Sequence, residues 1–256
     1  MRHLVVRLIE PASIKFFPGQ YVDFHVPGTE ETGRSRWRTS PSLESGHLEF
    51  VIKVYPNGLF SEFLDTDSEA RRPARHHRAV RRVHAARWPD SDLVFVGGGA
   101  GMAPILALLR SMASRGIQRK TTFYYGARGR RDLCFEDELR QLEKTLPSSA
   151  TCLRSPNPRT QTAGTARSGF ITDVLRRSET NLAETDAYVC GPPPMVEAAL
   201  ELLADAGRSG ETRLLRQVHD NGGPVTSTPT RRARLPAIRT RQIRPRHKCR
   251  YKEESR

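Results

Sequence analysis

The chain has 256 residues, 37% of them hydrophobic, and a formal net charge of +14. This length can hold two modest domains, and no apolar run is long enough to cross a membrane. The N-terminus does not have the pattern of a signal peptide. The four cysteines are too widely spaced for a disulfide framework, a zinc site or a plant-type iron–sulfur cluster. These features predict a cytoplasmic protein.

The positive charge is concentrated in two segments. Residues 71–88 contain seven Arg and no acidic residue, and residues 221–256 carry a net charge of +9. The remaining residues together have a net charge of −2. A nucleic-acid-binding protein that uses these two segments is therefore an alternative function. Neither segment interleaves aromatic residues with its basic residues, which argues against that alternative. The first segment has three histidines without neighbouring cysteines or carboxylates, so we expect no metal site.

The first 90 residues contain short strands and turns rather than long helices. Strands are predicted over Val5–Ile9, around Val22–Val26 and over Leu48–Tyr55. Pro56-Asn-Gly58 ends the last of these, and a short amphipathic helix follows up to Leu64. This pattern predicts a small β-barrel domain over residues 1–90.

A glycine-rich turn follows at residues 97–101. Leu93–Val96 reads as a buried strand, and an apolar helical pattern continues beyond the turn with Pro104 in the first turn of the helix. A strand, a glycine turn and a helix N-terminus form an anion site, because N–H groups and the helix dipole face the ligand. The glycines of the turn are Gly97, Gly98, Gly99 and Gly101.

Strands and helices then alternate, which predicts a parallel α/β domain over residues 91–220. The predicted strands are Thr121–Tyr125, Thr151–Leu153 and Asp186–Cys190, and the predicted helices are Phe135–Leu146, Ile171–Leu175 and Met195–Ala206. Ligands of such sheets bind at the carboxyl ends of the strands. Three segments fall there: Gly97–Gly101, Gly126–Arg128 and Cys190–Pro193.

Five motifs occur in the order found in the ferredoxin–NADP reductase superfamily. They are Phe17-Pro-Gly-Gln-Tyr21, Gly58-Leu-Phe-Ser61, Gly97-Gly-Gly-Ala-Gly-Met-Ala-Pro104, Tyr125-Gly-Ala-Arg128 and Cys190-Gly-Pro-Pro193. Two further stretches, Arg131-Asp-Leu-Cys-Phe-Glu-Asp-Glu-Leu139 and Gly169-Phe-Ile-Thr-Asp-Val174, resemble reductase components of bacterial multicomponent monooxygenases. The resemblance covers roughly residues 1–207.

The resemblance implies an FAD-binding barrel followed by a nicotinamide-binding domain. A hydride from NADH, with NADPH as the less favoured donor, would reduce the flavin. Single electrons would then pass to an iron–sulfur ferredoxin domain or protein and to a di-iron monooxygenase hydroxylase. We expect the 2Fe–2S domain to be separate from this chain or encoded just upstream of it.

The resemblance also implies roles for particular residues. Cys190 would lie beside the nicotinamide ring, and its structural alternative is a buried core cysteine. Arg128 would hold an adenosine 2′-phosphate or lie on a solvated turn. The other implied cofactor-binding residues are Arg34, Gly58 and Ser61 for FAD, and Gly97, Gly98, Gly99, Gly101, Pro104, Gly191, Pro192 and Pro193 for the dinucleotide.

Three segments depart from the family pattern: residues 34–39, residues 71–88, and the region from Arg213 onward. We interpret these segments as translations of the family sequence in a shifted reading frame. Codons can be chosen for residues 71–87 that, read from the second base, encode GDPLAITGPFGVFTLR. The same procedure on residues 208–219 yields VPERRVFYDKFT. Both strings match the missing family segments, and a shifted reading around residues 35–39 gives AMAN.

This hypothesis predicts that the chain as written binds FAD poorly or not at all. Seven arginines in place of a barrel strand would leave charges in the core without partners. Residues 221–256 are rich in Arg, Pro and Thr and lack periodicity, so we expect a disordered basic tail read past the original stop codon.

Overall fold

The chain divides into two compact units in the computed structural model. Unit 1 comprises Met1–Ala85 and Val218–Lys248, and unit 2 comprises Ala86–Gln217 and Cys249–Arg256. The structure describes residues 1–10, 12, 14, 16, 18–19, 21–25, 32–36, 46–58, 61–62, 64, 74–77, 91–129, 132–146, 149–154, 170–206, 213–214 and 238–248.

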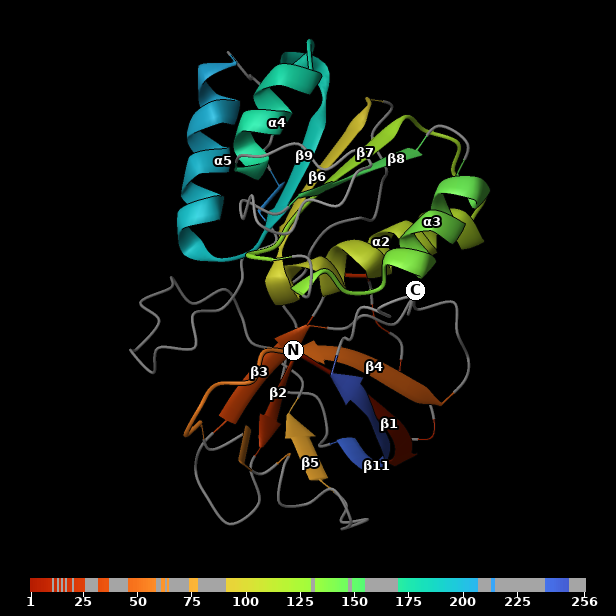
Figure 1. The fold of residues 1–256 in the computed structure, drawn as a ribbon. Helices are drawn as coiled ribbons and strands as arrows, with labels where there is room; N and C mark the ends of the chain where they lie inside the picture. The colour runs from red at the N-terminus through yellow and green to blue at the C-terminus, as the bar shows by residue number, and fades with distance from the viewer. Residues whose placement is uncertain are drawn as a thin grey trace, which may run out of the picture. The chain divides into compact units, whose positions relative to one another are not determined.

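Unit 1 contains a six-stranded antiparallel sheet with the strand order β3-β2-β5-β11-β1-β4 (Figure 1). Cα atoms of the outermost strands β3 and β4 come within 8 Å of each other, while closure into a barrel stays a prediction. The strands are β1 (Arg2–Glu10), β2 (Tyr21–His25), β3 (Thr32–Arg36), β4 (His47–Ile52), β5 (Ala74–His77) and β11 (Ile238–Lys248).

The described core of unit 1 lies on one face of β1 and β4. Leu4 pairs with Phe50 and Val6 pairs with Leu48 in the antiparallel register. Successive side chains of a strand point to opposite faces, so the alternating apolar residues of both strands meet on one side. The buried cluster is Leu4, Val6, Leu8, Phe16, Leu48, Phe50, Ile52 and Leu64.

Three strands of unit 1 lie in segments where the sequence did not predict them: β3, β5 and β11. The expectation of a disordered tail over 221–256 is wrong for Ile238–Lys248, which pairs antiparallel with β1 on one side and β5 on the other. The physical reason is that backbone N–H and C=O groups of neighbouring strands need partners, and a basic segment supplies them as well as an apolar one. β5 likewise forms within the basic segment 71–88. Residues 221–237 and 249–256 lie outside the described residues.

Unit 2 contains a five-stranded parallel sheet with the order β10-β9-β6-β7-β8, which confirms the predicted α/β pattern. The central strand β6 is buried along its whole length, as expected for a parallel strand covered on both faces. The strands are β6 (Leu93–Gly98), β7 (Thr121–Gly126), β8 (Ser149–Arg154), β9 (Asp186–Cys190) and β10 (Arg213–Leu214).

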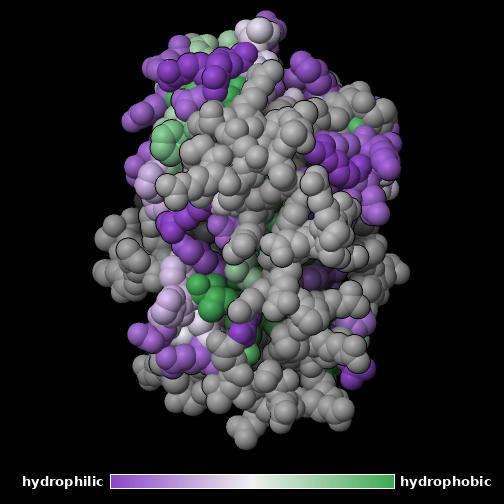
Figure 2. Space-filling view, in the orientation of Figure 1, coloured by the Kyte–Doolittle hydropathy of each residue, from purple (hydrophilic) through white to green (hydrophobic). Residues whose placement is uncertain are grey.

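Helices cover both faces of this sheet: α2 (Met102–Ser114) and α3 (Glu136–Thr145) lie on one face, and α4 (Ile171–Ser178) and α5 (Pro193–Asp205) on the other (Figure 1). Val94, Val96 and Tyr124 belong to the core cluster beneath α4 and α5. In the view of Figure 2, the described surface over α3, α4 and α5 is mainly hydrophilic. No described helix is both long and apolar enough to span a membrane.

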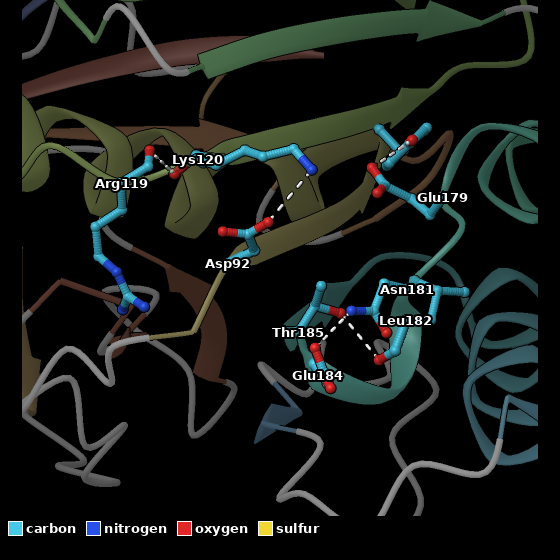
Figure 3. Close-up of polar contacts among 10 residues, drawn as sticks. Asp92, Arg119, Lys120, Glu179, Asn181, Leu182, Glu184 and Thr185 are labelled. Carbon is cyan, nitrogen blue, oxygen red and sulfur yellow. Dashed lines mark hydrogen bonds and ion pairs between the residues drawn. The ribbon is translucent and has the colours of Figure 1, made fainter.

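Polar side chains join the segments at the amino ends of these strands (Figure 3). Lys120 Nζ lies 3.3 Å from a carboxylate oxygen of Asp92, and the Ser91 hydroxyl donates to Asp186 at 2.5 Å. The short 3-10 helix η4 (Leu182–Glu184) precedes β9. An open depression of ≈ 430 Å³ is lined there by Arg176, Glu179, Thr180, Asn181, Leu182, Ala183, Leu202, Asp205 and Ala206.

Candidate functional site

The three segments predicted to meet at the carboxyl ends of the strands lie on neighbouring strands of one sheet. Gly97 pairs with Tyr125 of β7 and with Cys190 of β9. Gly98 pairs with Gly126, the last residue of β7. Because all these strands run parallel, their carboxyl ends share one edge of the sheet, which we call the carboxyl edge.

Close packing explains the absence of a side chain at several of these glycines. A Cβ on Gly98 would lie 2.6 Å from the Sδ of Met195, and one on Gly97 would lie 2.8 Å from the Cδ1 of Ile105. A Cβ on Gly101 would collide with the backbone carbonyl of Cys190. The turns after β6 and β9 are therefore in direct contact, and Gly101 is required by the protein's own packing, because a backbone carbonyl cannot give way as the end of a side chain can.

Gly99 differs from the other glycines of the turn. Its φ is +54°, in the left-handed region that favours glycine, and a Cβ there would have no neighbour within 4 Å among the described residues. Gly99–Gly101 forms the 3-10 helix η1, which leads directly into α2. Gly99 is therefore the glycine of this turn that has open space where a ligand can approach the backbone.

The N-terminus of α2 follows the glycine turn, as predicted. The helix begins at Met102, Pro104 is a buried residue of its first turn, and no acidic residue lies in that turn. A proline at this position does not remove a helical hydrogen bond, because the first N–H groups of a helix have no partner within it. The absence of carboxylates favours an anion at this helix end.

The segment after β7 carries the predicted Arg128, which is exposed. Gly126 contacts the start of α4, since a Cβ on Gly126 would lie 3.3 Å from the Cβ of Ile171. The preceding residue, Phe170, has 71% of its surface exposed. The Asp173 carboxylate accepts the Phe170 N–H at 3.1 Å, which fixes the backbone at this helix start. The exposed Phe170 therefore directly precedes the residue that packs against Gly126 at the carboxyl edge.

Cys190 ends β9 at the carboxyl edge, and its side chain is fully buried. The role beside a nicotinamide ring therefore stays a prediction. Gly191 and Pro192 lead into α5, which begins at Pro193, two residues before the predicted start at Met195. Prolines are well accommodated in the first turn of a helix, which explains the earlier start.

The residues predicted to bind FAD lie in unit 1. The buried Ser61 hydroxyl accepts the Tyr55 N–H at 3.0 Å, and the Gly58 N–H donates to the Tyr55 carbonyl at 3.2 Å. Gly58 and Ser61 are thus joined through Tyr55 in one turn, where Asn57 has a φ of +59°. Arg34 belongs to β3, where it pairs with Asp23 of β2.

Sequence reasoning missed two residues near the carboxyl edge. Phe170 is the most exposed large hydrophobic residue described, and its place directly before a predicted amphipathic helix is a signal that could have identified it. Tyr125 was seen as part of a strand, but its hydroxyl bonds to the backbone of Asp132 and Cys134. No sequence pattern predicts that contact.

Two family models match the chain: the oxidoreductase FAD-binding domain over residues 1–71 and the oxidoreductase NAD-binding domain over residues 95–201. The reductase component of propane 2-monooxygenase from Rhodococcus jostii (strain RHA1) is 42% identical over 207 residues, which are 78% of this chain and 54% of the relative. The corresponding protein of Mycolicibacterium goodii is 41% identical over 208 residues, 78% of this chain and 58% of the relative. The chain thus spans just over half the length of these curated relatives.

More distant relatives match by sequence or by fold. The toluate 1,2-dioxygenase electron transfer component of Pseudomonas putida is 30% identical over 196 residues, 76% of this chain and 56% of that protein. The Amycolatopsis cytochrome P450 reductase GcoB superposes with a TM-score of 0.68 at 24% identity, covering 84% of this chain and 69% of that one. The chain therefore belongs to the ferredoxin–NADP reductase family, with an FAD-binding and an NAD-binding oxidoreductase domain.

Proposed function

We propose that this chain descends from, and is organised as, a flavin-dependent NAD(P)H reductase that supplies electrons to an oxygenase. The observation that carries the proposal is the meeting of the glycine turn, the Arg128 segment and the Cys190–Pro193 turn at one sheet edge within the NAD-binding domain. Parallel α/β sheets bind dinucleotides at this edge.

The described residues of the carboxyl edge fit a dinucleotide. The open space over Gly99 and the N-terminus of α2 would take the pyrophosphate, because backbone N–H groups and the helix dipole favour its negative charge. The exposed ring of Phe170 would stack on the adenine. We favour NADH over NADPH, with Arg128 as the cation beside the adenosine ribose and Cys190 beside the nicotinamide.

FAD would be held in unit 1 by the turn that contains Gly58 and Ser61, with Arg34 as a further contact. When bound, FAD supplies the hydride acceptor and the donor of single electrons. The residues of the chain would orient the two cofactors and keep their charged groups paired. The electrons would leave for an iron–sulfur carrier and a di-iron monooxygenase hydroxylase, and the chain would act in the cytoplasm.

We further propose that three segments of this polypeptide come from a shifted reading frame and that FAD binding is lost as a result. The match to the FAD-binding model ends at residue 71, where the run of arginines begins, and the separate match to the NAD-binding model begins at residue 95. The end of the first match supports an interruption at the arginine-rich segment.

The test compares the chain as written with a repaired chain in which GDPLAITGPFGVFTLR replaces residues 71–87, VPERRVFYDKFT replaces residues 208–219 and AMAN replaces residues 35–39. Visible flavin absorbance after purification and an NADH titration are measured on both. We expect stoichiometric FAD and NADH oxidation in the repaired chain alone. Stoichiometric flavin in the chain as written would contradict the loss of FAD binding, and a repaired chain that holds FAD without oxidising NADH would contradict the reductase. Resequencing the gene tests the frame directly.

A further inference from the structure

The hydroxyl of Tyr125 connects the sheet of unit 2 to the segment that follows it. The Tyr125 ring is fully buried and stacks on Phe123 with centroids 5.6 Å apart and an interplanar angle of 10°. Its hydroxyl oxygen accepts the N–H of Cys134 at 3.2 Å and donates to the carbonyl of Asp132 at 3.4 Å. The phenol thus holds the backbone before α3 from a fixed position on β7.

The segment held in this way lies between β7 and α3, and its described residues are 126–129 and 132–135. It contains a turn in which the Asp132 N–H donates to the Gly129 carbonyl at 2.9 Å. At its far end Phe135 has a φ of +62°, and its carbonyl accepts the Leu139 N–H of the first turn of α3. The segment is therefore anchored at both ends, and Tyr125 ties its later part to the sheet. Arg128 lies between these anchors.

We propose that the Tyr125 hydroxyl is a positioning group that sets the segment Gly126–Phe135 for contact with the adenosine half of NADH. The inference rests on the proposed function and names a residue that governs nucleotide affinity without touching the nucleotide. The Cys134 amide is buried. If the phenol oxygen is removed, this N–H loses its hydrogen bond to Tyr125, and water cannot reach it as a replacement. The segment would then shift to find another partner.

Tyr124 provides a matched control because it is the neighbouring buried tyrosine of the same strand. Its side chain belongs to the core cluster beneath α4, and its hydroxyl donates to Glu179 at 2.7 Å. Tyr125→Phe and Tyr124→Phe each delete one hydroxyl that makes a hydrogen bond and leave a buried ring. Only Tyr125→Phe releases the segment that contains Arg128.

The experiment titrates the full chain and both variants with NADH, 5′-AMP and nicotinamide mononucleotide. Tyr125→Phe should weaken NADH and 5′-AMP binding by about 5- to 30-fold, the range expected when one buried amide loses its partner. It should leave the affinity for nicotinamide mononucleotide unchanged, and Tyr124→Phe should leave all three affinities unchanged. In the repaired chain the KM for NADH should rise while kcat stays within about twofold.

The outcomes separate this inference from the function on which it rests. A parent chain that does not bind NADH overturns both. Equal affinities in the parent and Tyr125→Phe, or an equal loss in Tyr124→Phe, overturn the positioning role alone. If Tyr125→Phe does not fold, amide hydrogen exchange of the parent chain, measured with and without NADH, tests the inference instead. NADH should protect Gly126–Phe135, and unchanged exchange there despite NADH binding overturns the inference.

Discussion

The amino and carboxyl ends of the parallel sheet in unit 2 are built from different interactions. At the amino ends, side chains connect the strands, as in the pairs Asp92–Lys120 and Ser91–Asp186. At the carboxyl edge, backbone packs directly on backbone, as where Gly101 meets Cys190. A contact between two backbone segments, such as Gly101 with Cys190, tolerates no added atom, whereas side-chain pairs at a surface can be exchanged at little cost. The two ends should therefore respond very differently to substitution.

The largest effect is expected from Gly101→Ala at the carboxyl edge. The new Cβ would collide with the backbone carbonyl of Cys190, which cannot move without separating β9 from α2. We expect the free energy of unfolding to fall by about 3 kcal/mol or more, measured by denaturant unfolding. Gly116→Ala is the control, with a φ of +62° but no neighbour within 4 Å in the part of the chain that the structure describes, and should cost about 1–2 kcal/mol. Equal losses would show that backbone contact does not set the requirement at Gly101.

A smaller and purely functional effect is expected from Phe170→Ala. The ring is 71% exposed, so its loss should leave the unfolding transition unchanged. If it stacks on the adenine, NADH binding should weaken by about 5- to 100-fold, as base–aromatic contacts do elsewhere. Phe170→Tyr keeps the aromatic face and should bind normally. NADH affinity that does not change in Phe170→Ala would remove this residue from the site.

The smallest effect is expected at the amino end, from Lys120→Met. Lys120 and Asp92 are 65% and 47% exposed, so water and salt screen their attraction. The free energy of unfolding should fall by about 1 kcal/mol at most, and by less at high salt. NADH affinity should not change. A larger loss of stability, or any loss of NADH affinity, would contradict the distinction between the two ends.

The elements of unit 2 follow closely from the sequence because each strand is a run of apolar residues between clear turns. Leu93–Val96 and Asp186–Cys190 predict β6 and β9, and their pairing brings Gly97 beside Cys190. The same runs identify the carboxyl edge. The position of the Tyr125 hydroxyl depends on how the segment before α3 folds back, which periodicity does not encode.

Unit 1 was harder to predict where its strands are basic. β1 and β4 are rich in apolar residues, so both could be recognised as strands from the sequence. β11 contains Arg, Gln, Pro and Lys, and its place between β1 and β5 depends on backbone pairing between segments more than 160 residues apart. No local pattern reports such a pairing, which is why disorder was expected there.

The arrangement of helices on the two sheet faces has a consequence for synthesis of the chain on the ribosome. The side chains of Val94, Val96 and Tyr124 are buried by α4 and α5. Their face of the sheet is fully covered only after Asp205, the last residue of α5, has been added. About eighty residues separate Tyr124 from that point, and at ordinary translation rates their synthesis takes roughly 4–16 s. During this interval an apolar surface is uncovered, so nascent chains that stop before α5 should be strong clients of chaperones.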